Sequence, residues 1–226
     1  MTEVSATDIG GRVEAPLISC DAEASLRSGT YSLLANLLAS PPDQGILDLI
    51  TGIDRSSTEG AETMLGAAWH MLAEAAERAN LSALDDEYHA LFIGLGRGEL
   101  IPFGSWYVTG FLMEQPLARL RADLARLGFE RQEGVSEPED HVAGLCDVMA
   151  ILNTEGEVAA YELQREFFER HMLPWMPRFF RDLQEAKSAS FYRAVGQLGE
   201  QFLEVEKEFL RASAPASEST RQDGLS

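Results

Sequence analysis

The sequence is poor in cysteine, and this excludes the disulfide-stabilised scaffolds. Its 226 residues include only Cys20 and Cys146, with no Cys-x-x-Cys pair. Neither a disulfide framework nor a cysteine-based zinc site is therefore expected. Cys146 falls in an apolar helical pattern, where we expect it to pack as a small hydrophobic residue.

Long apolar runs are also missing. No stretch approaches the about 18 consecutive apolar residues of a transmembrane helix. Residues 1–21 lack the basic start and the apolar run that mark a secretory signal. We therefore expect no membrane span and a cytoplasmic location.

Basic residues are scarce. The chain has 18 Lys and Arg against 37 Asp and Glu, which gives a net charge of −19. A protein so charged repels the phosphates of nucleic acids and anionic lipids, so neither is expected as a partner. It would attract a basic partner, although the same carboxylates could serve solubility alone.

Alternating apolar and polar runs bounded by hairpin turns are absent, so no strands are predicted. Apolar residues instead recur at three- and four-residue intervals, most clearly over residues 61–79, which predicts amphipathic helices. The chain is long enough for one domain with a sizeable core. We predict a single all-α, multi-helix domain over residues 23–211, with a flexible segment over residues 1–22 and a disordered tail over residues 212–226.

Several helix ends can be predicted from local signals. Asp43 is placed to cap a short helix that follows it. Ser82 and Asp85 have the spacing of a capping box for the helix that contains Leu84 and Tyr88. Gln115, followed by proline, predicts a helix start, and Gly128 predicts the end of that helix.

Two short segments about forty residues apart carry most of the functional signal. The first covers residues 87–94 and continues, after a glycine-rich stretch, into residues 102–107. Tyr88, Leu91 and Phe92 share one helix face, which plain core packing would also explain. The irregular loop adds bulky apolar groups that cannot all be buried, so we predict an apolar groove here.

The second segment is Ser-Glu-Pro-Glu-Asp-His at residues 136–141, directly before an apolar helix. Ser136 and Glu139 fit a capping box for that helix. Asp140 lies among many carboxylates, and carboxylates bind arginine guanidinium groups in bidentate pairs. Acidic residues at a helix N-terminus are equally explained by the helix dipole. His141 fits a buried, hydrogen-bonded histidine as well as a binding residue.

These segments also carry a family resemblance. The order Tyr-x-x-Leu-Phe-x-Gly, Pro-aromatic-Gly-Ser and Glu-Pro-x-Asp-His resembles the TorD/DmsD/NarJ family of redox-enzyme maturation chaperones. The resemblance covers residues 25–210, with the specific matches in residues 84–107 and 136–152. It implies a cytoplasmic all-helical protein that binds molybdoenzyme precursors and their twin-arginine signal peptides. It also assigns Pro138, Asp140 and His141 to the signal-peptide site.

The sequence departs from some members of that family in one respect. They have tryptophan in the glycine-rich loop and after the proline, where this sequence has small residues and Phe103. Smaller side chains would change the shape of the pocket, so the resemblance does not fix the client.

We therefore predict a non-enzymatic chaperone for the precursor of a molybdopterin oxidoreductase, such as formate dehydrogenase or a DMSO or TMAO reductase. It would bind the leader and the apo form until the cofactor is inserted before export, as a monomer or a helix-swapped dimer. No catalytic residue, metal or bound cofactor is predicted. Some relatives are reported to contact molybdopterin or guanine nucleotide, but nothing in this sequence places such a contact. The predicted client-binding residues are Tyr88, Leu91, Phe92, Gly94, Pro102, Phe103, Gly104, Ser105, Trp106, Pro138, Asp140 and His141.

Two other classes of function remain open. A metal-dependent helical-bundle enzyme could use His89, His141 and carboxylates, with His171 as a third imidazole. Neither a His-Glu-x-x-His nor a Gly-x-Ser-x-Gly pattern supports catalysis, however. A structural subunit of a larger assembly could use the aromatic surface as a permanent interface.

Overall fold

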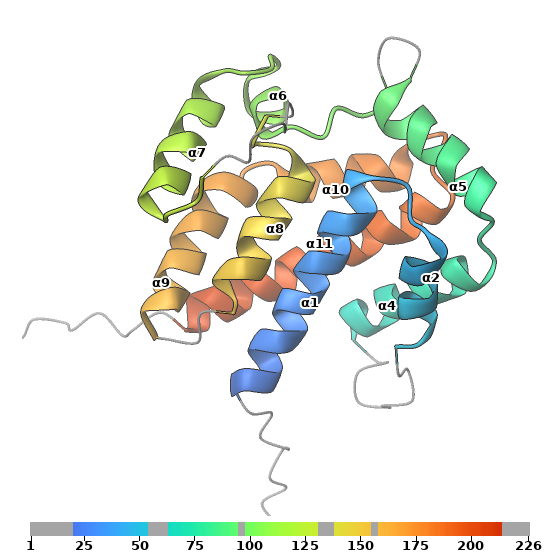
Figure 1. Ribbon diagram of the computed structural model, residues 1–226, viewed down its shortest axis with the longest axis horizontal. Helices are drawn as coiled ribbons and strands as arrows, with labels where there is room; N and C mark the ends of the chain where they lie inside the picture. Colours follow the sequence, from blue (N-terminus) through green and yellow to red (C-terminus); the bar gives the residue numbers. More distant parts are fainter. Residues whose placement is uncertain (1–19, 54–62, 95–97, 131–137, 155–157, 214–226) are drawn as a thin grey trace, which may run out of the picture.

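The computed structural model describes residues 20–53, 63–94, 98–130, 138–154 and 158–213, and every regular element in these ranges is a helix (Figure 1). The predicted all-α fold is therefore confirmed. The α-helices are α1 (Cys20–Ala39), α2 (Gln44–Thr51), α4 (Met64–Glu77), α5 (Leu81–Tyr88), α6 (Gly104–Thr109), α7 (Gln115–Arg126), α8 (Val142–Leu152), α9 (Val158–Phe167), α10 (Met176–Glu185) and α11 (Phe191–Ala212). Two π-helical turns extend α5 and α9, namely η1 (His89–Ile93) and η2 (Phe168–Met172).

The core forms where α11 packs along α10 and α4 and where α1 packs along α8. Most side chains of α8 are apolar and buried, because neighbouring parts of the protein cover this helix on nearly all sides. Full burial of a large apolar side chain contributes about 1.5–3 kcal/mol, so these helices are held mainly by their shared interior. Fully buried side chains in it include Tyr31, Leu34, Leu72, Met149, Phe179, Phe180, Val195 and Leu198.

Helix ends follow the sequence signals at Asp43, Gln115 and Gly128 but not at Ser82. The Asp43 carboxylate accepts a hydrogen bond from the Ile46 amide, as predicted for a cap. Helix α7 starts at Gln115, and Gly128 follows its end with a φ of +82°, which glycine adopts without strain. The capping box at Ser82 was wrong, because the side chain of the preceding Asn80 caps α5.

The described helices run from Cys20 to Ala212. Helix α1 begins at Cys20, three residues inside the segment predicted to be flexible, and α11 ends at Ala212. The rest of the predicted N-terminal segment and most of the predicted tail lie outside the described residues.

A buried polar cluster joins α1 to α9 and α11. The Arg27 guanidinium donates to both carboxylate oxygens of Glu206, at 2.6 and 2.8 Å, and to Gln164 at 2.9 Å. The Tyr31 hydroxyl donates to the same carboxylate at 3.0 Å. The Arg27 guanidinium also lies 4.2 Å from the centre of the Phe209 ring, within the range of a cation–π contact. These bonds fix the register of three helices.

A sharp reversal after η1 directs the chain toward the second segment. Gly94 has a φ of +60°, and the backbone then runs back along the helix end, where the Leu100 amide donates to the Leu91 carbonyl at 2.8 Å. At Gly98 a Cβ would lie only 2.5 Å from the Phe92 carbonyl carbon, so the close approach requires glycine. The reversal brings the following loop to the start of α6.

Candidate functional site

The two sequence segments meet in space. Phe103 and His141 form an isolated antiparallel bridge. The Gly104 amide donates to the Asp140 carbonyl at 2.9 Å, and the Val142 amide donates to the Pro102 carbonyl at 2.9 Å. Residues far apart in sequence are thus joined by main-chain hydrogen bonds, which do not depend on side-chain identity.

Asp140 lies at the centre of this junction. Its side chain is buried, with 3% of the residue exposed, and its Oδ2 accepts a hydrogen bond from the Ser105 amide at 2.7 Å. Its Oδ1 is buried and has no hydrogen-bond partner among the described residues. A buried carboxylate oxygen without a donor is costly, which makes it the strongest candidate for contact with a ligand.

Asp140 lines a cavity of about 250 Å³. The wall is formed mainly by α6, α7, α8 and the segment that links η2 to α10. At Gly104 a Cβ would lie 3.0 Å from Nε1 of Trp175, so this glycine allows the indole to approach the backbone closely. The same Nε1 donates to the His171 carbonyl at 2.7 Å. Other residues along the wall are Val108, Pro116, Arg119, Leu120, Leu145, Arg170 and Pro174.

His141 supports the junction from the side of α8. It is buried, its Nδ1 accepts a hydrogen bond from the Ala143 amide at 3.2 Å, and its ring lies edge-on to Phe103 with 5.0 Å between the centroids. His141 is therefore the N-cap of α8. The spacing predicted neither this cap nor this helix start.

The predicted capping box at Ser136 and Glu139 is corrected by this arrangement. Ser136 lies outside the described residues, and the helix begins only at Val142. The Glu139 carboxylate instead pairs with Arg121 of α7 at 2.9 Å. Helix α8 starts later than the predicted capping box implies, because the Val142 amide donates its hydrogen bond to the Pro102 carbonyl of the other segment.

Tyr88 and Leu91, predicted to line a groove, are buried. Tyr88 is 6% exposed and Leu91 is 0% exposed. The Tyr88 hydroxyl donates to the Leu38 carbonyl at 3.3 Å, and its ring packs against Phe92 and Tyr192 of α11. The apolar face predicted for binding is thus mostly core, and only Phe92 is partly exposed.

The remaining predicted residues surround the junction. Pro102 and Ser105 are buried, whereas Phe103, Trp106 and Pro138 are partly exposed. Trp106 lines a second recess of about 370 Å³, which Glu99, Leu100, Ile101, Tyr107, Gly110, Arg178 and Asp182 complete. Burial and the neighbouring Asp182 raise the pKa of Tyr107, so its hydroxyl stays protonated.

Comparison with known proteins identifies the family. The family model described as "Nitrate reductase delta subunit" matches residues 58–181, more than half of the chain. The chain belongs to the nitrate reductase delta subunit family.

Relatives of this family member confirm the resemblance to TorD. The TorD chaperone protein of Vibrio cholerae is 27% identical over 129 residues, which are 53% of this chain and 59% of that protein. The TorD chaperone protein of Vibrio atlanticus is 23% identical over 205 residues, which are 81% of this chain and 94% of that protein. These relatives are named as chaperones and not as enzymes.

A solved structure supports the fold. A crystal structure described as that of a candidate redox enzyme maturation protein from Archaeoglobus fulgidus has a TM-score of 0.52 and 19% identity. The similarity covers 79% of this chain and 94% of that one. At this identity the likeness concerns the helical architecture alone.

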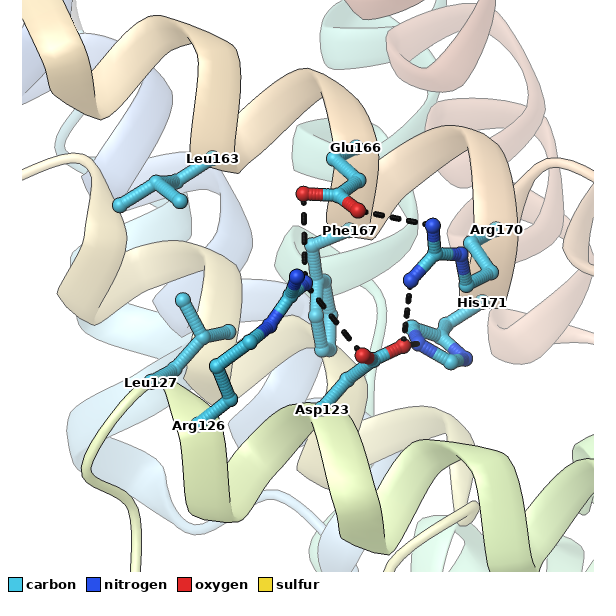
Figure 2. Close-up of a pocket in the computed structure, with 8 residues that line it drawn as sticks. All are labelled: Asp123, Arg126, Leu127, Leu163, Glu166, Phe167, Arg170 and His171. Carbon is cyan, nitrogen blue, oxygen red and sulfur yellow. Dashed lines mark hydrogen bonds and ion pairs between the residues drawn. The ribbon is translucent and has the colours of Figure 1, made fainter.

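One polar cluster near the cavity was not predicted from the sequence (Figure 2). Asp123 of α7 accepts hydrogen bonds from Arg170 at 2.9 Å and pairs with His171 at 2.8 Å, while Glu166 pairs with Arg170 at 2.7 Å and with Arg126 at 3.2 Å. The space that they enclose is about 10 Å³, which holds at most one water. The cluster therefore fastens α7 to α9 and η2 rather than forming a pocket.

The titration of this cluster follows from its burial and its partners. Burial opposes the ionisation of Asp123, but the hydrogen bonds from Arg170 and His171 outweigh it, and the pKa of Asp123 is lowered. Burial lowers the pKa of His171 in spite of the neighbouring Asp123. His171 is thus neutral near pH 7, and Asp123 is ionised.

Two further findings bear on the alternatives. Within the described ranges, no three His, Cys, Asp or Glu side chains converge on a point that could hold a metal ion. His89 is exposed on η1, and its Nδ1 bonds the Asp85 carbonyl, whereas His141 is occupied as a cap. None of the described helices has the length and apolar character to cross a bilayer.

Proposed function

We propose that the protein is a cytoplasmic, non-enzymatic chaperone that binds the twin-arginine leader and the apo form of a molybdopterin oxidoreductase subunit. It would hold the precursor until the cofactor is inserted before export. The observation that carries the proposal is that Asp140 lines a cavity at the junction of the two segments and that its buried Oδ1 has no hydrogen-bond partner among the described residues. The chaperone names of the TorD relatives support the same class of function.

An arginine of the leader is the chemical group that fits Asp140 best. Guanidinium groups donate several N–H bonds in a plane, and charge-assisted bonds to a buried carboxylate are about twice as strong as neutral ones. Arg170 also lines the cavity, but Asp123 and Glu166 already bind its guanidinium. Arg119 lines the cavity too, and among the described residues neither arginine hydrogen-bonds Asp140, so its carboxylate is open to an arginine from outside the chain.

The apolar part of the leader would lie along the outer side of the junction. Phe103 and Trp106 are partly exposed there, and Leu100 and Ile101 continue the apolar surface into the 370 Å³ recess. The recess also contains the charged side chains of Glu99, Arg178 and Asp182, so a leader there would meet apolar and polar groups together.

The net charge adds a long-range contribution. A charge of −19 attracts a doubly cationic leader and speeds its encounter with the protein. Salt screens such attraction over about 8–10 Å at physiological ionic strength, so leader binding should weaken as salt is added.

Isothermal titration with a leader peptide tests the proposal. We expect an Arg-Arg peptide to bind more tightly than its Lys-Lys counterpart, because lysine cannot form the planar bidentate pair. Asp140→Asn should weaken binding by roughly 1.5–3 kcal/mol, the contribution of a hydrogen bond to a charged group. Asp147→Asn is the matched control, because this exposed carboxylate, on the helix that follows Asp140, lies outside the cavity.

Two outcomes would contradict the proposal. One is equal affinity for the Arg-Arg and Lys-Lys peptides. The other is an equal loss of affinity in the two variants, which would show that only the overall charge matters. Circular dichroism melts of both variants establish that each is folded before binding is compared.

A further inference from the structure

Another groove, distinct from the Asp140 cavity and from the recess at Trp106, lies among α1, α2, α4 and α11. Its volume is about 550 Å³, and it shares no lining residue with the cavity at Asp140. That volume is within the range of about 300–1,000 Å³ that is common for ligand pockets. Its walls are mainly apolar, with Trp69 of α4 on one side and Phe209 of α11 on the other.

Large apolar side chains along this groove are exposed. Leu26 of α1 is 65% exposed, Leu49 of α2 is 57% exposed, and Val205 of α11 is 47% exposed. Single exposed apolar residues are ordinary, but these three come from three helices and line one groove. A contiguous apolar patch of this kind indicates an interaction surface.

The four helices around the groove carry more acidic than basic residues, and Lys207 and Arg211 of α11 pair with Glu204 and Glu208. Arg27 and Glu206 also line it, but they are bonded to each other and cancel. Helices α1, α2 and α4 contain no other Lys or Arg. They do carry further carboxylates, among them Glu23, Asp48, Glu74 and Glu77. A partner for this surface should therefore be apolar at its centre and basic at its flanks.

We propose that this groove binds an amphipathic helix of a partner polypeptide, with an apolar face and lysine or arginine on either side. Such a helix presents apolar anchors at i, i+3, i+4 and i+7 on one face. An extended peptide that binds by strand addition would need a strand edge to pair with, and the described residues contain no strand. A fatty acid or an anionic lipid would meet the surplus of carboxylates. The inference goes beyond the proposed function, because it concerns a surface separate from Asp140.

A synthetic peptide of roughly 18 residues, about five helical turns, is the probe. It is composed of leucine and lysine with the leucines on one helix face, and a leucine–glutamate peptide of the same pattern serves as its counterpart. Binding is followed by calorimetry and by tryptophan fluorescence, and Trp69→Phe assigns the fluorescence change to the groove. We expect the lysine peptide to bind and the glutamate peptide not to bind.

Two charge-matched variants then locate the site. Leu26→Asp places a carboxylate in the groove, and Ile151→Asp places one at a position on α8 that is 49% exposed and outside the groove. We expect Leu26→Asp to weaken binding about tenfold or more, because an apolar anchor contact is lost. Ile151→Asp should leave the affinity unchanged or raise it slightly through its added charge, and Asp140→Asn should also leave it unchanged.

Other results would overturn the inference. Equal effects of Leu26→Asp and Ile151→Asp would mean that the peptide binds through overall charge. A change from dimer to monomer in Leu26→Asp, seen by sedimentation velocity, would mean that a second copy occupies the groove. The leader titration at Asp140 is measured separately, so the failure of either proposal can be told from the failure of the other.

Discussion

Glu206→Gln should be among the most destabilising single changes in this protein. Both carboxylate oxygens of Glu206 bind Arg27, and one of them also binds the Tyr31 hydroxyl. The amide keeps one acceptor but removes the charge, so the buried guanidinium of Arg27 is left uncompensated. Breaking a buried ion pair from one side costs about 3–5 kcal/mol. Against a total stability of about 5–15 kcal/mol, this is a large share.

A double variant shows whether charge or packing is responsible. Arg27→Met with Glu206→Leu removes both charges and keeps apolar volume, so no buried charge remains. Tyr31 and Gln164 still lose their partners, which costs about 1–3 kcal/mol for each buried group left unsatisfied. The two losses together are comparable to the cost of the uncompensated charge, so we expect the double variant to be about as stable as Glu206→Gln, although it removes more hydrogen bonds.

Urea denaturation followed by circular dichroism measures these differences. Glu204→Gln is the matched control, because Glu204 pairs with Lys207 on the same helix but is exposed. Loss of this exposed ion pair should lower the free energy of unfolding by less than about 1 kcal/mol. The reasoning would be refuted if Glu206→Gln destabilised the protein no more than Glu204→Gln does. It would also be refuted if the double variant lost as much stability as Arg27→Met and Glu206→Leu lose in sum when each is made alone.

Three further predictions concern the site and its support. Gly104→Ala would place a Cβ 3.0 Å from Nε1 of Trp175, so we expect a loss of about 1–3 kcal/mol and altered tryptophan fluorescence; an unchanged melting temperature would contradict the close packing. His141→Ala removes the cap of α8 and should cost about 0.5–2 kcal/mol in urea denaturation, whereas His141→Asn restores a capping acceptor and should recover most of it; equal losses would argue against a capping role. The lowered pKa of Asp123 means that its stabilising contribution is present above the unfolded-state pKa and is lost as the pH falls through the folded-state pKa. Asp123→Asn should therefore flatten the acid side of the stability profile, and an unaltered slope there would rule this out.

Local signals in the sequence predicted most of the helices. Asp43 and Gln115 act on neighbouring residues, so their effects can be predicted without knowledge of the fold. The main-chain contact between the two segments could not be predicted from local signals. No local pattern states that the Gly104 amide will bond the Asp140 carbonyl.

Two errors show where local reasoning ends. Tyr88 and Leu91 form the same helical face whether that face lines a groove or a core, and the decision depends on Tyr192, which is distant in sequence. The capping box before α8 failed for a similar reason, because a carbonyl of the other segment, that of Pro102, takes the amide of Val142. In both cases a tertiary contact replaced the interaction that the spacing predicted.

In the proposed binding of a leader, the construction of the junction would separate recognition of charge from recognition of shape. The Asp140 carboxylate is held by the Ser105 amide, and the two segments are joined by main-chain bonds, so the side chains at Phe103 and Trp106 are not needed to place it. These two partly exposed side chains can therefore differ in size without moving the carboxylate. An arginine would be recognised at a fixed point, while the apolar surface around it could be matched to a particular client. Changes at Phe103 and Trp106 should then alter which leader is preferred and keep the preference for arginine.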